Sequence, residues 1–172
     1  YQKKHFWDYE NKGFYFTSDK VESLIVRNKE IYDGAIPSGN SVSAYNYIRL
    51  GRILSRSDYE EIAHDLVNSF APQLNRYGSG STMLLHAIDF MEGPSFEVII
   101  RGNYKTSREL IKEIQKHPQP NKVIIFDKNN SKLFNYIDNY PKDGKETLVY
   151  VCQNYSCQLP TGDITKIKSL LE

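Results

Sequence analysis

The stretch GPSFEVIIRGNYKTSRELIKEIQKHPQPNKVIIF, residues 93 to 126, decides the fold class of this chain. It holds two short apolar runs, FEVII and KVIIF, separated by the helix-forming segment TSRELIKEIQKH, in which Thr106 and Glu109 have the spacing of a capping box. The run from Val123 to Phe126 lacks the polar alternation of a sheet with one face in water. The stretch therefore predicts strand, helix and strand of a parallel sheet covered by helices on both faces.

The same alternation continues towards the C-terminus. The segment SKLFNYIDNY, residues 131 to 140, predicts a second helix, and TLVYVC, residues 147 to 152, predicts a third strand after a turn at Asp143 and Gly144. The last segment, DITKIKSLL, predicts a helix that Asp163 caps. We therefore expect a small three-stranded parallel α/β unit over residues 94 to 172.

Helices dominate before Pro94. Apolar residues recur at helical spacing in residues 38 to 54, 57 to 74 and 84 to 91, the second segment opening with a capping box of Ser57 and Glu60. Pro72 predicts a kink or an early end in that segment. Residues 14 to 17 and 24 to 27 are two β-prone pieces that predict a small hairpin ahead of the helices. We assign residues 1 to 93 to one helical domain.

Charge and cysteine content limit the partners and the cellular compartment that we expect. The 172 residues include 22 basic and 21 acidic ones, so neither nucleic acid nor a membrane surface is expected as a partner. Two cysteines are too few for a secreted disulfide framework, which makes a cytoplasmic location the expectation, and no Cys or His cluster predicts a metal site. No cofactor is expected. The chain opens at Tyr1 without a methionine, which suggests that it is part of a longer protein.

The stretch KEIYDGAIPSGNS, residues 29 to 41, has two interpretations. In the first, Gly34 makes a turn and Ser38 and Asn40 cap the following helix. In the second, Glu30 and Asp33 lie at the mouth of a cavity, where carboxylates position sugar hydroxyls or act as acid and base. Three residues of separation do not decide between these interpretations, because a paired-carboxylate mechanism depends on distance in space.

Three motifs, GFYFT (13 to 17), LIVRNKEIYDGAIPSGNS (24 to 41) and CQNYSCQLP (152 to 160), resemble the C-terminal end of the thioredoxin-domain-containing family that includes the spermatogenesis-associated thioredoxin-like protein. The resemblance covers essentially the whole chain and about the last quarter of a full-length member. It implies a mixed α and β fold, in which residues 1 to 93 are the closing helical hairpins of an (α/α) toroid similar to six-hairpin glycosidases and N-acylglucosamine 2-epimerases.

The resemblance also implies site residues and partners. In such a toroid Glu30 and Asp33 become candidate catalytic residues of the funnel, and the candidate substrate-binding residues are Arg27, Tyr32, Ser38 and Asn40. The implied partners are the upstream toroid and thioredoxin-like domains of the same protein and a carbohydrate ligand. A toroid without its other hairpins exposes apolar helix faces, so we also expect self-association.

Aromatic and cysteine residues support different functions. The aromatic residues Tyr9, Phe14, Tyr15, Phe16 and Tyr32 surround the expected hairpin and serve either as core or as platforms for a sugar. Cys152 and Cys157 are either structural or a redox pair, and a disulfide between them needs Cα atoms within about 7 Å.

Three functions therefore remain open. The chain is part of a sugar-binding or carbohydrate-metabolising toroid without independent catalysis, an interaction module, or a thiol redox module.

Overall fold

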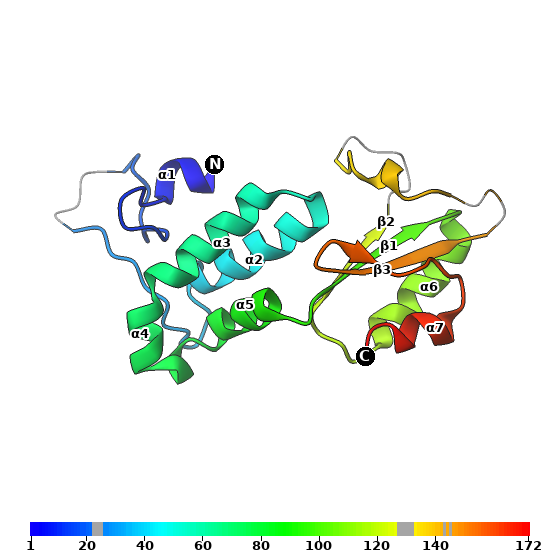
Figure 1. Cartoon of the computed structure of the whole chain (residues 1–172). Helices are drawn as coiled ribbons and strands as arrows, with labels where there is room; N and C mark the ends of the chain where they lie inside the picture. The colour runs from blue at the N-terminus through cyan, green and yellow to red at the C-terminus, as the bar shows by residue number, and fades with distance from the viewer. Residues whose placement is uncertain (22–25, 127–132, 143, 145) are drawn as a thin grey trace. The chain divides into compact units, whose positions relative to one another are not determined.

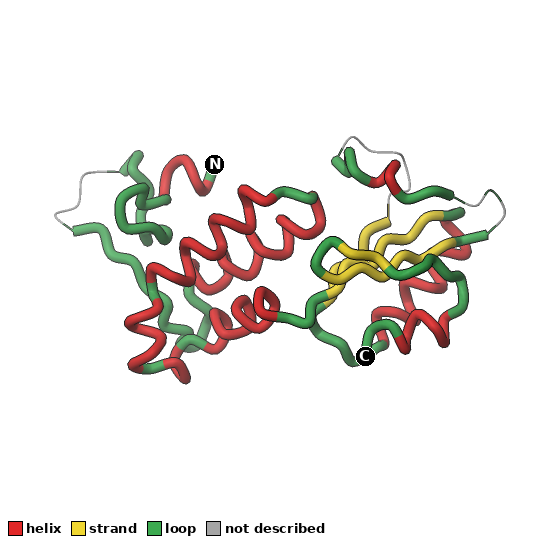
Figure 2. Tube along the Cα trace, in the orientation of Figure 1, coloured by secondary structure: helices red, strands yellow, loops and turns green. Residues whose placement is uncertain are grey.

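The computed structural model describes residues 1–21, 26–126, 133–142, 144 and 146–172. The chain divides into two compact units (Figures 1 and 2). The helical unit contains Tyr1–Gly51 and Arg56–Glu92, and the sheet unit contains Arg52–Ser55 and Gly93–Glu172.

The helical unit contains α1 (Gln2–Phe6), α2 (Gly39–Leu54, whose last residues belong to the sheet unit), α3 (Ser57–Ser69), α4 (Ala71–Arg76), the 3₁₀ turn η1 (Gly78–Gly80) and α5 (Thr82–Glu92). The apolar spacing predicted α2, α3 and α5, whereas α1, α4 and η1 were not predicted as separate helices. Pro72 ends α3 as expected, because a proline has no N–H for a helix interior but fits the first turn of the next helix.

One apolar cluster joins these helices. Ala44 of α2, Leu66 of α3 and Leu84 of α5 are fully buried in it. The rings of Trp7 and Phe14 meet edge to face at 4.7 Å in the same cluster. Aromatic rings in this arrangement bury large apolar areas, so the segment before α2 is tied to the helices.

Two predicted capping boxes are wrong. Helix α3 begins after Arg56 without a side-chain cap, so Ser57 does not cap it. Helix α6 (Tyr104–Lys116) begins two residues before Thr106, because the Asn103 carboxamide oxygen accepts the Thr106 N–H. Asparagine is preferred over threonine as an N-cap, which agrees with a helix that begins after Asn103.

The sheet unit contains a mixed sheet and not the three-stranded parallel unit that the sequence predicted. Its strands are β1 (Phe96–Arg101), β2 (Lys122–Phe126), β3 (Leu148–Gln153) and β4 (Ser156–Cys157), in the order β2-β1-β3-β4. Strands β1 and β2 are parallel, whereas β3 is antiparallel to both β1 and β4.

The described part of the connection before β3 agrees with the direction of this strand. A parallel connection needs a long crossover, which α6 supplies between β1 and β2. Between β2 and β3 the described residues contain only the 3₁₀ helix η2 (Ile137–Asn139), where residues 131 to 140 predicted an α-helix. Ser131 and Lys132 of this predicted helix, and Asp143 of the predicted turn, lie outside the described residues.

Helices α6 and α7 cover one face of the sheet, and the described residues show no second α-helical layer of the kind predicted for the other face. The core on the α6 side includes Val98 and Val151 of the strands, Ile114 of α6 and Ile167 of α7 (Ile164–Ser169). Asp163 caps α7 as expected, by accepting the Thr165 N–H. The opposite face is covered by a different group of side chains from β1, β3, the end of α2 and the η2 segment: Glu97, Ile99, Cys152, Arg52, Tyr136 and Tyr140.

The described residues do not contain the hairpin predicted before the helices. Phe14 pairs with Trp7 in a single antiparallel bridge, and the Phe16 N–H donates to the Asn28 carbonyl oxygen at 2.8 Å. Leu24 and Ile25, half of the predicted second strand, lie outside the described residues.

Candidate functional site: an aromatic groove

Asp33 is bound by backbone groups on both carboxylate oxygens. Its Oδ1 accepts the Ser38 N–H and its Oδ2 accepts the Met83 N–H, both at 2.8 Å, while its own N–H donates to the Gly80 carbonyl at 2.7 Å. Met83 lies in the first turn of α5, where free N–H groups and the helix dipole favour a carboxylate. The structure therefore gives Asp33 a structural position.

Ser38 and Asn40 also hold the backbone. The Ser38 hydroxyl oxygen accepts the Ser41 N–H at 3.0 Å, as an N-cap does. The Asn40 carboxamide accepts the Phe14 N–H at 2.7 Å and donates to the carbonyls of Phe14 and Glu30 at 2.9 and 3.0 Å. Asn40 is 4% exposed, so it joins two segments from inside.

Arg27 and Tyr32 make contacts of a different kind. The Arg27 guanidinium donates to the Thr17 carbonyl and lies 4.0 Å from the centre of the Tyr15 ring. Tyr32 is 58% exposed, and its ring packs beside Gly80. Neither residue lines the hollow described next.

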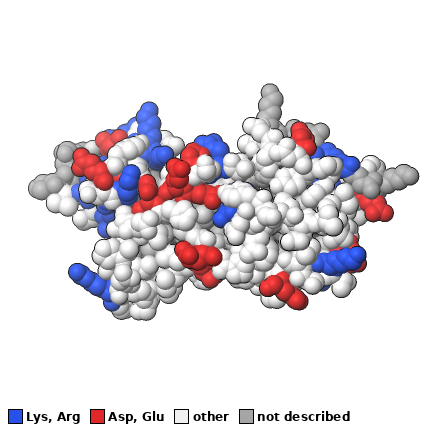
Figure 3. Space-filling view, in the orientation of Figure 1, with Lys and Arg blue, Asp and Glu red and all other residues white. Residues whose placement is uncertain are grey.

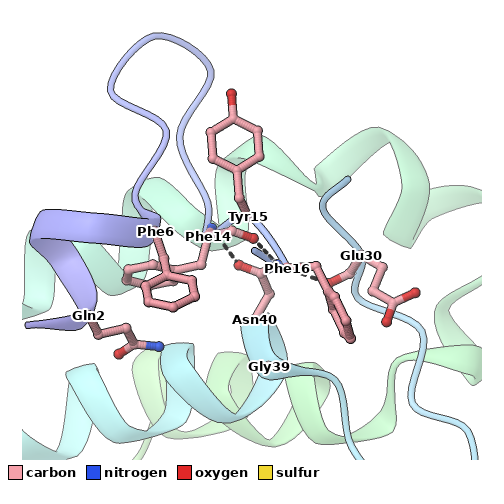
Figure 4. A pocket seen from close by; sticks show the side chains of 8 residues that line it. All are labelled: Gln2, Phe6, Phe14, Tyr15, Phe16, Glu30, Gly39 and Asn40. Carbon is pink, nitrogen blue, oxygen red and sulfur yellow. Dashed lines mark hydrogen bonds between the residues drawn. The ribbon is translucent and has the colours of Figure 1, made fainter. Parts of the chain in front are cut away.

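Residues of α1, residues 14 to 16, Glu30 and the start of α2 surround a hollow of about 270 Å³ (Figure 4). Its aromatic and polar lining residues are Phe6, Phe14, Tyr15, Phe16, Gln2, Glu30 and Asn40. A second hollow of about 280 Å³ shares Phe16 and Glu30 and adds Thr17, Val26 and Asn28. We call the two together the aromatic groove.

Glu30 and Phe16 are the accessible members of the aromatic groove. Phe16 is 75% exposed, and Figure 4 places its ring beside the Glu30 side chain. Glu30 is exposed, and no hydrogen bond or ion pair joins its carboxylate to another of the described residues. The Thr17 hydroxyl is buried and likewise has no partner within the described ranges. Phe16 and Glu30 are available to a ligand, unlike Asp33.

The charged side chains of Lys29 and Asp8, next to the aromatic groove, pair with each other. Lys29 donates to the Asp8 carboxylate at 2.7 Å and to the Lys12 carbonyl at 2.6 Å. Burial alone would raise the pKa of Asp8, but the bonds from Lys29 and from two backbone N–H groups hold it well below its usual value. The Asp8 carboxylate in turn raises the pKa of Tyr15. On the face shown in Figure 3, basic and acidic side chains lie among one another.

Cys152 and Cys157 form a disulfide in the sheet unit. Their Cα atoms are 3.9 Å apart, within the limit that a bond requires, because the chain turns back through a tight hairpin between β3 and β4. Within the described ranges, no group of three His, Cys, Asp or Glu side chains could hold a metal ion. No helix there is long and apolar enough to cross a membrane.

Gln2 and Phe6 are members of the groove that the sequence did not indicate. They lie four residues apart in α1 and therefore share one helix face. That spacing is the only signal for them, and a five-residue helix gives it little weight. Phe14, Tyr15 and Phe16 were identified as candidate platform residues from their aromatic content.

The chain thus combines a helical unit that carries an aromatic groove with a mixed α/β unit that carries a disulfide. No family model matches it. It is similar over 99% of its length to Spermatogenesis-associated protein 20 of Homo sapiens and of Rattus norvegicus, each at 26% identity, and it spans 23% of each. An uncharacterised protein of Caenorhabditis elegans is 25% identical over 96% of the chain.

The chain spans about a quarter of the length of the curated relatives it matches. The matching region is the C-terminal part of the spermatogenesis-associated relatives, which confirms this part of the expected resemblance.

Proposed function

We propose that the aromatic groove binds a carbohydrate. The observation that carries the proposal is the pairing of an exposed flat ring, Phe16, with an unpartnered carboxylate, Glu30, along one hollow. A sugar presents an apolar C–H face, which packs on an aromatic ring, and hydroxyls at its edge, which donate to a carboxylate. Glu30 and Asn28 are the exposed polar residues that line the hollow with this ring.

The proposal gives Glu30 a positioning role without catalysis. A hydrolytic mechanism needs two carboxylates across one bond, about 5 to 9.5 Å apart. Asp33, the expected second carboxylate, has both oxygens bound to backbone N–H groups. In a longer protein the helical unit would form the closing hairpins of a toroid, and any catalytic partner of Glu30 would come from other hairpins.

Calorimetric titration tests the proposal. The chain is titrated with N-acetylated hexosamines and with short glucose and mannose oligosaccharides, and we expect one of these classes to bind. Phe16→Ala should weaken binding about 2- to 10-fold through the lost ring contact. Glu30→Gln should weaken it about 10- to 100-fold, since hydrogen bonds to a charged acceptor are the strong ones.

Tyr9→Ala is the matched control, because Tyr9 is 66% exposed and does not line the aromatic groove. It should bind like the wild type. Equal binding by wild type, Phe16→Ala and Glu30→Gln, or no binding of any sugar, would refute the carbohydrate proposal.

We propose a second candidate function, docking to another part of a longer protein. Tyr32 and Tyr77 are 58% and 62% exposed, and both rings lie against Gly80, so they form one apolar patch. Patches of this kind mark interaction sites. If the patch also joins copies of the isolated chain, light scattering will show an associated species that Tyr32→Ser with Tyr77→Ser converts to monomer. A monomeric wild type would remove the support for self-association.

A further inference from the structure

The disulfide of the sheet unit lies at the tip of a two-residue hairpin. Cys152 and Cys157 are directly opposite each other in β3 and β4, followed by the pair Gln153 and Ser156. The two turn residues, Asn154 and Tyr155, have φ values of 50° and 61°. Positive φ at both positions is the geometry of a type I′ turn, which matches the twist of the flanking strands. The hairpin presents the disulfide at the end of the sheet.

The two cysteines have unequal access to solvent. Cys152 is 2% exposed and lies on the sheet face of Glu97, its neighbour in β1. Cys157 is exposed, as are all the residues from 153 to 160. A thiolate in solution must approach the sulfur that it attacks along the sulfur–sulfur bond. Only Cys157 lies where such an approach is open.

We propose that the Cys152–Cys157 disulfide is a thiol–disulfide exchange site, attacked at Cys157 Sγ by the thiolate of a dithiol. The reductant sulfur bonds to Cys157 Sγ as the bond to Cys152 Sγ breaks, and Cys152 leaves as a thiolate that takes a proton from water. The second thiol of the reductant then displaces Cys157 from the mixed disulfide. Two electrons pass to the protein, which gains two thiols, and the reductant becomes a disulfide.

A tyrosine stands beside the sulfur that leaves in the second step. The Tyr140 hydroxyl oxygen is 3.6 Å from Cys157 Sγ, close enough for its O–H to donate to a sulfur that carries charge. Burial and, less strongly, the charge of Glu97 raise the pKa of Tyr140, so that its hydroxyl keeps the proton it donates. This arrangement is independent of the aromatic groove, which belongs to the helical unit.

The test uses the oxidised chain under native conditions. It is treated with reduced glutathione, quenched with acid and N-ethylmaleimide, and mapped by peptide mass spectrometry. We expect glutathione on Cys157 and maleimide on Cys152 in the mixed-disulfide species, and two maleimides after dithiothreitol. Glutathione on Cys152, or a disulfide that resists dithiothreitol until the chain is unfolded, would overturn the proposal.

Single-cysteine variants give a second measurement. In Cys152→Ser the remaining Cys157 should react with Ellman's reagent at least about 10-fold faster than Cys152 does in Cys157→Ser, because reactivity follows exposure. Equal rates in two folded variants would contradict the proposed asymmetry. The mapping of the wild type decides the matter if either variant fails to fold.

Discussion

Asp33→Ala should unfold the helical unit more easily and leave the aromatic groove able to bind. The change removes two carboxylate hydrogen bonds, to the N–H groups of Ser38 and Met83. Hydrogen bonds to a charged group contribute about 1.5 to 3 kcal/mol each, and Asp33 is half-buried, so the lower end applies. We expect a loss of about 2 to 3 kcal/mol, a large share of the stability of a small unit.

Tryptophan fluorescence measures this loss of stability in the helical unit, to which Asp33 belongs. The chain has one tryptophan, Trp7, which is buried in the core of the helical unit. With a urea slope of about 1 kcal/mol per molar, the midpoint should fall by about 2 to 3 M. Asp33→Asn keeps one acceptor oxygen and should lose about half as much.

An exposed carboxylate provides the control for Asp33. Asp58 pairs with Arg56 at the surface, where an ion pair contributes little, so Asp58→Ala should unfold close to the wild type. A stable Asp33→Ala chain that has lost sugar binding would refute the structural assignment of Asp33 and restore it as a site residue.

Three further predictions concern other contacts. Asn40→Ala removes three bonds between Phe14, Glu30 and the start of α2, and should cost about 2 to 4 kcal/mol in urea unfolding followed by Trp7. Asp8→Asn should lower the free energy of unfolding by about 2 to 3 kcal/mol at pH 7, because it breaks the pair with Lys29. Since the folded-state pKa of Asp8 is depressed, the full difference in stability between wild type and variant is present above the ordinary pKa of 3.8 and shrinks as the pH falls below it. Urea unfolding at pH 3 and at pH 7 measures this change. Gly102→Ala brings a Cβ to 2.7 Å from Thr147 Cα and should destabilise the sheet unit by about 2 kcal/mol in thermal circular dichroism, whereas Gly78→Ala meets nothing within 4 Å and should not.

Helix positions were predictable from the sequence because burial repeats along each helix. Leu66 and Leu84 occupy the apolar stripes that the spacing indicated, and both are fully buried. Helix starts were less predictable, because Asn103 and Thr106 are both capping residue types, and in the structure Asn103 accepts the Thr106 N–H. Which of two capping residues bonds to the helix start depends on the backbone conformation just before the helix, and the residue types alone do not specify that conformation.

The direction of β3 could not be predicted from its own residues. A run such as LVYVC is apolar in both directions, and a sheet position buried on both faces accepts either. The connection before the strand decides the direction, and its predicted helix is a 3₁₀ turn in the described residues. The disulfide has the same origin, since an antiparallel return places Cys157 opposite Cys152.

Glu30 and Asp33 show why a candidate site needs the folded chain. Both are acidic, and they are three residues apart in one loop, so every local pattern treats them alike. They differ through Met83, whose N–H reaches Asp33 from fifty residues away and, together with Ser38, occupies both of its oxygens. A carboxylate that already accepts two backbone N–H groups must give up these hydrogen bonds to bind a ligand, which costs free energy. A carboxylate that faces only solvent gives up hydrogen bonds to water instead. Glu30 is therefore the residue of this stretch on which ligand binding should depend.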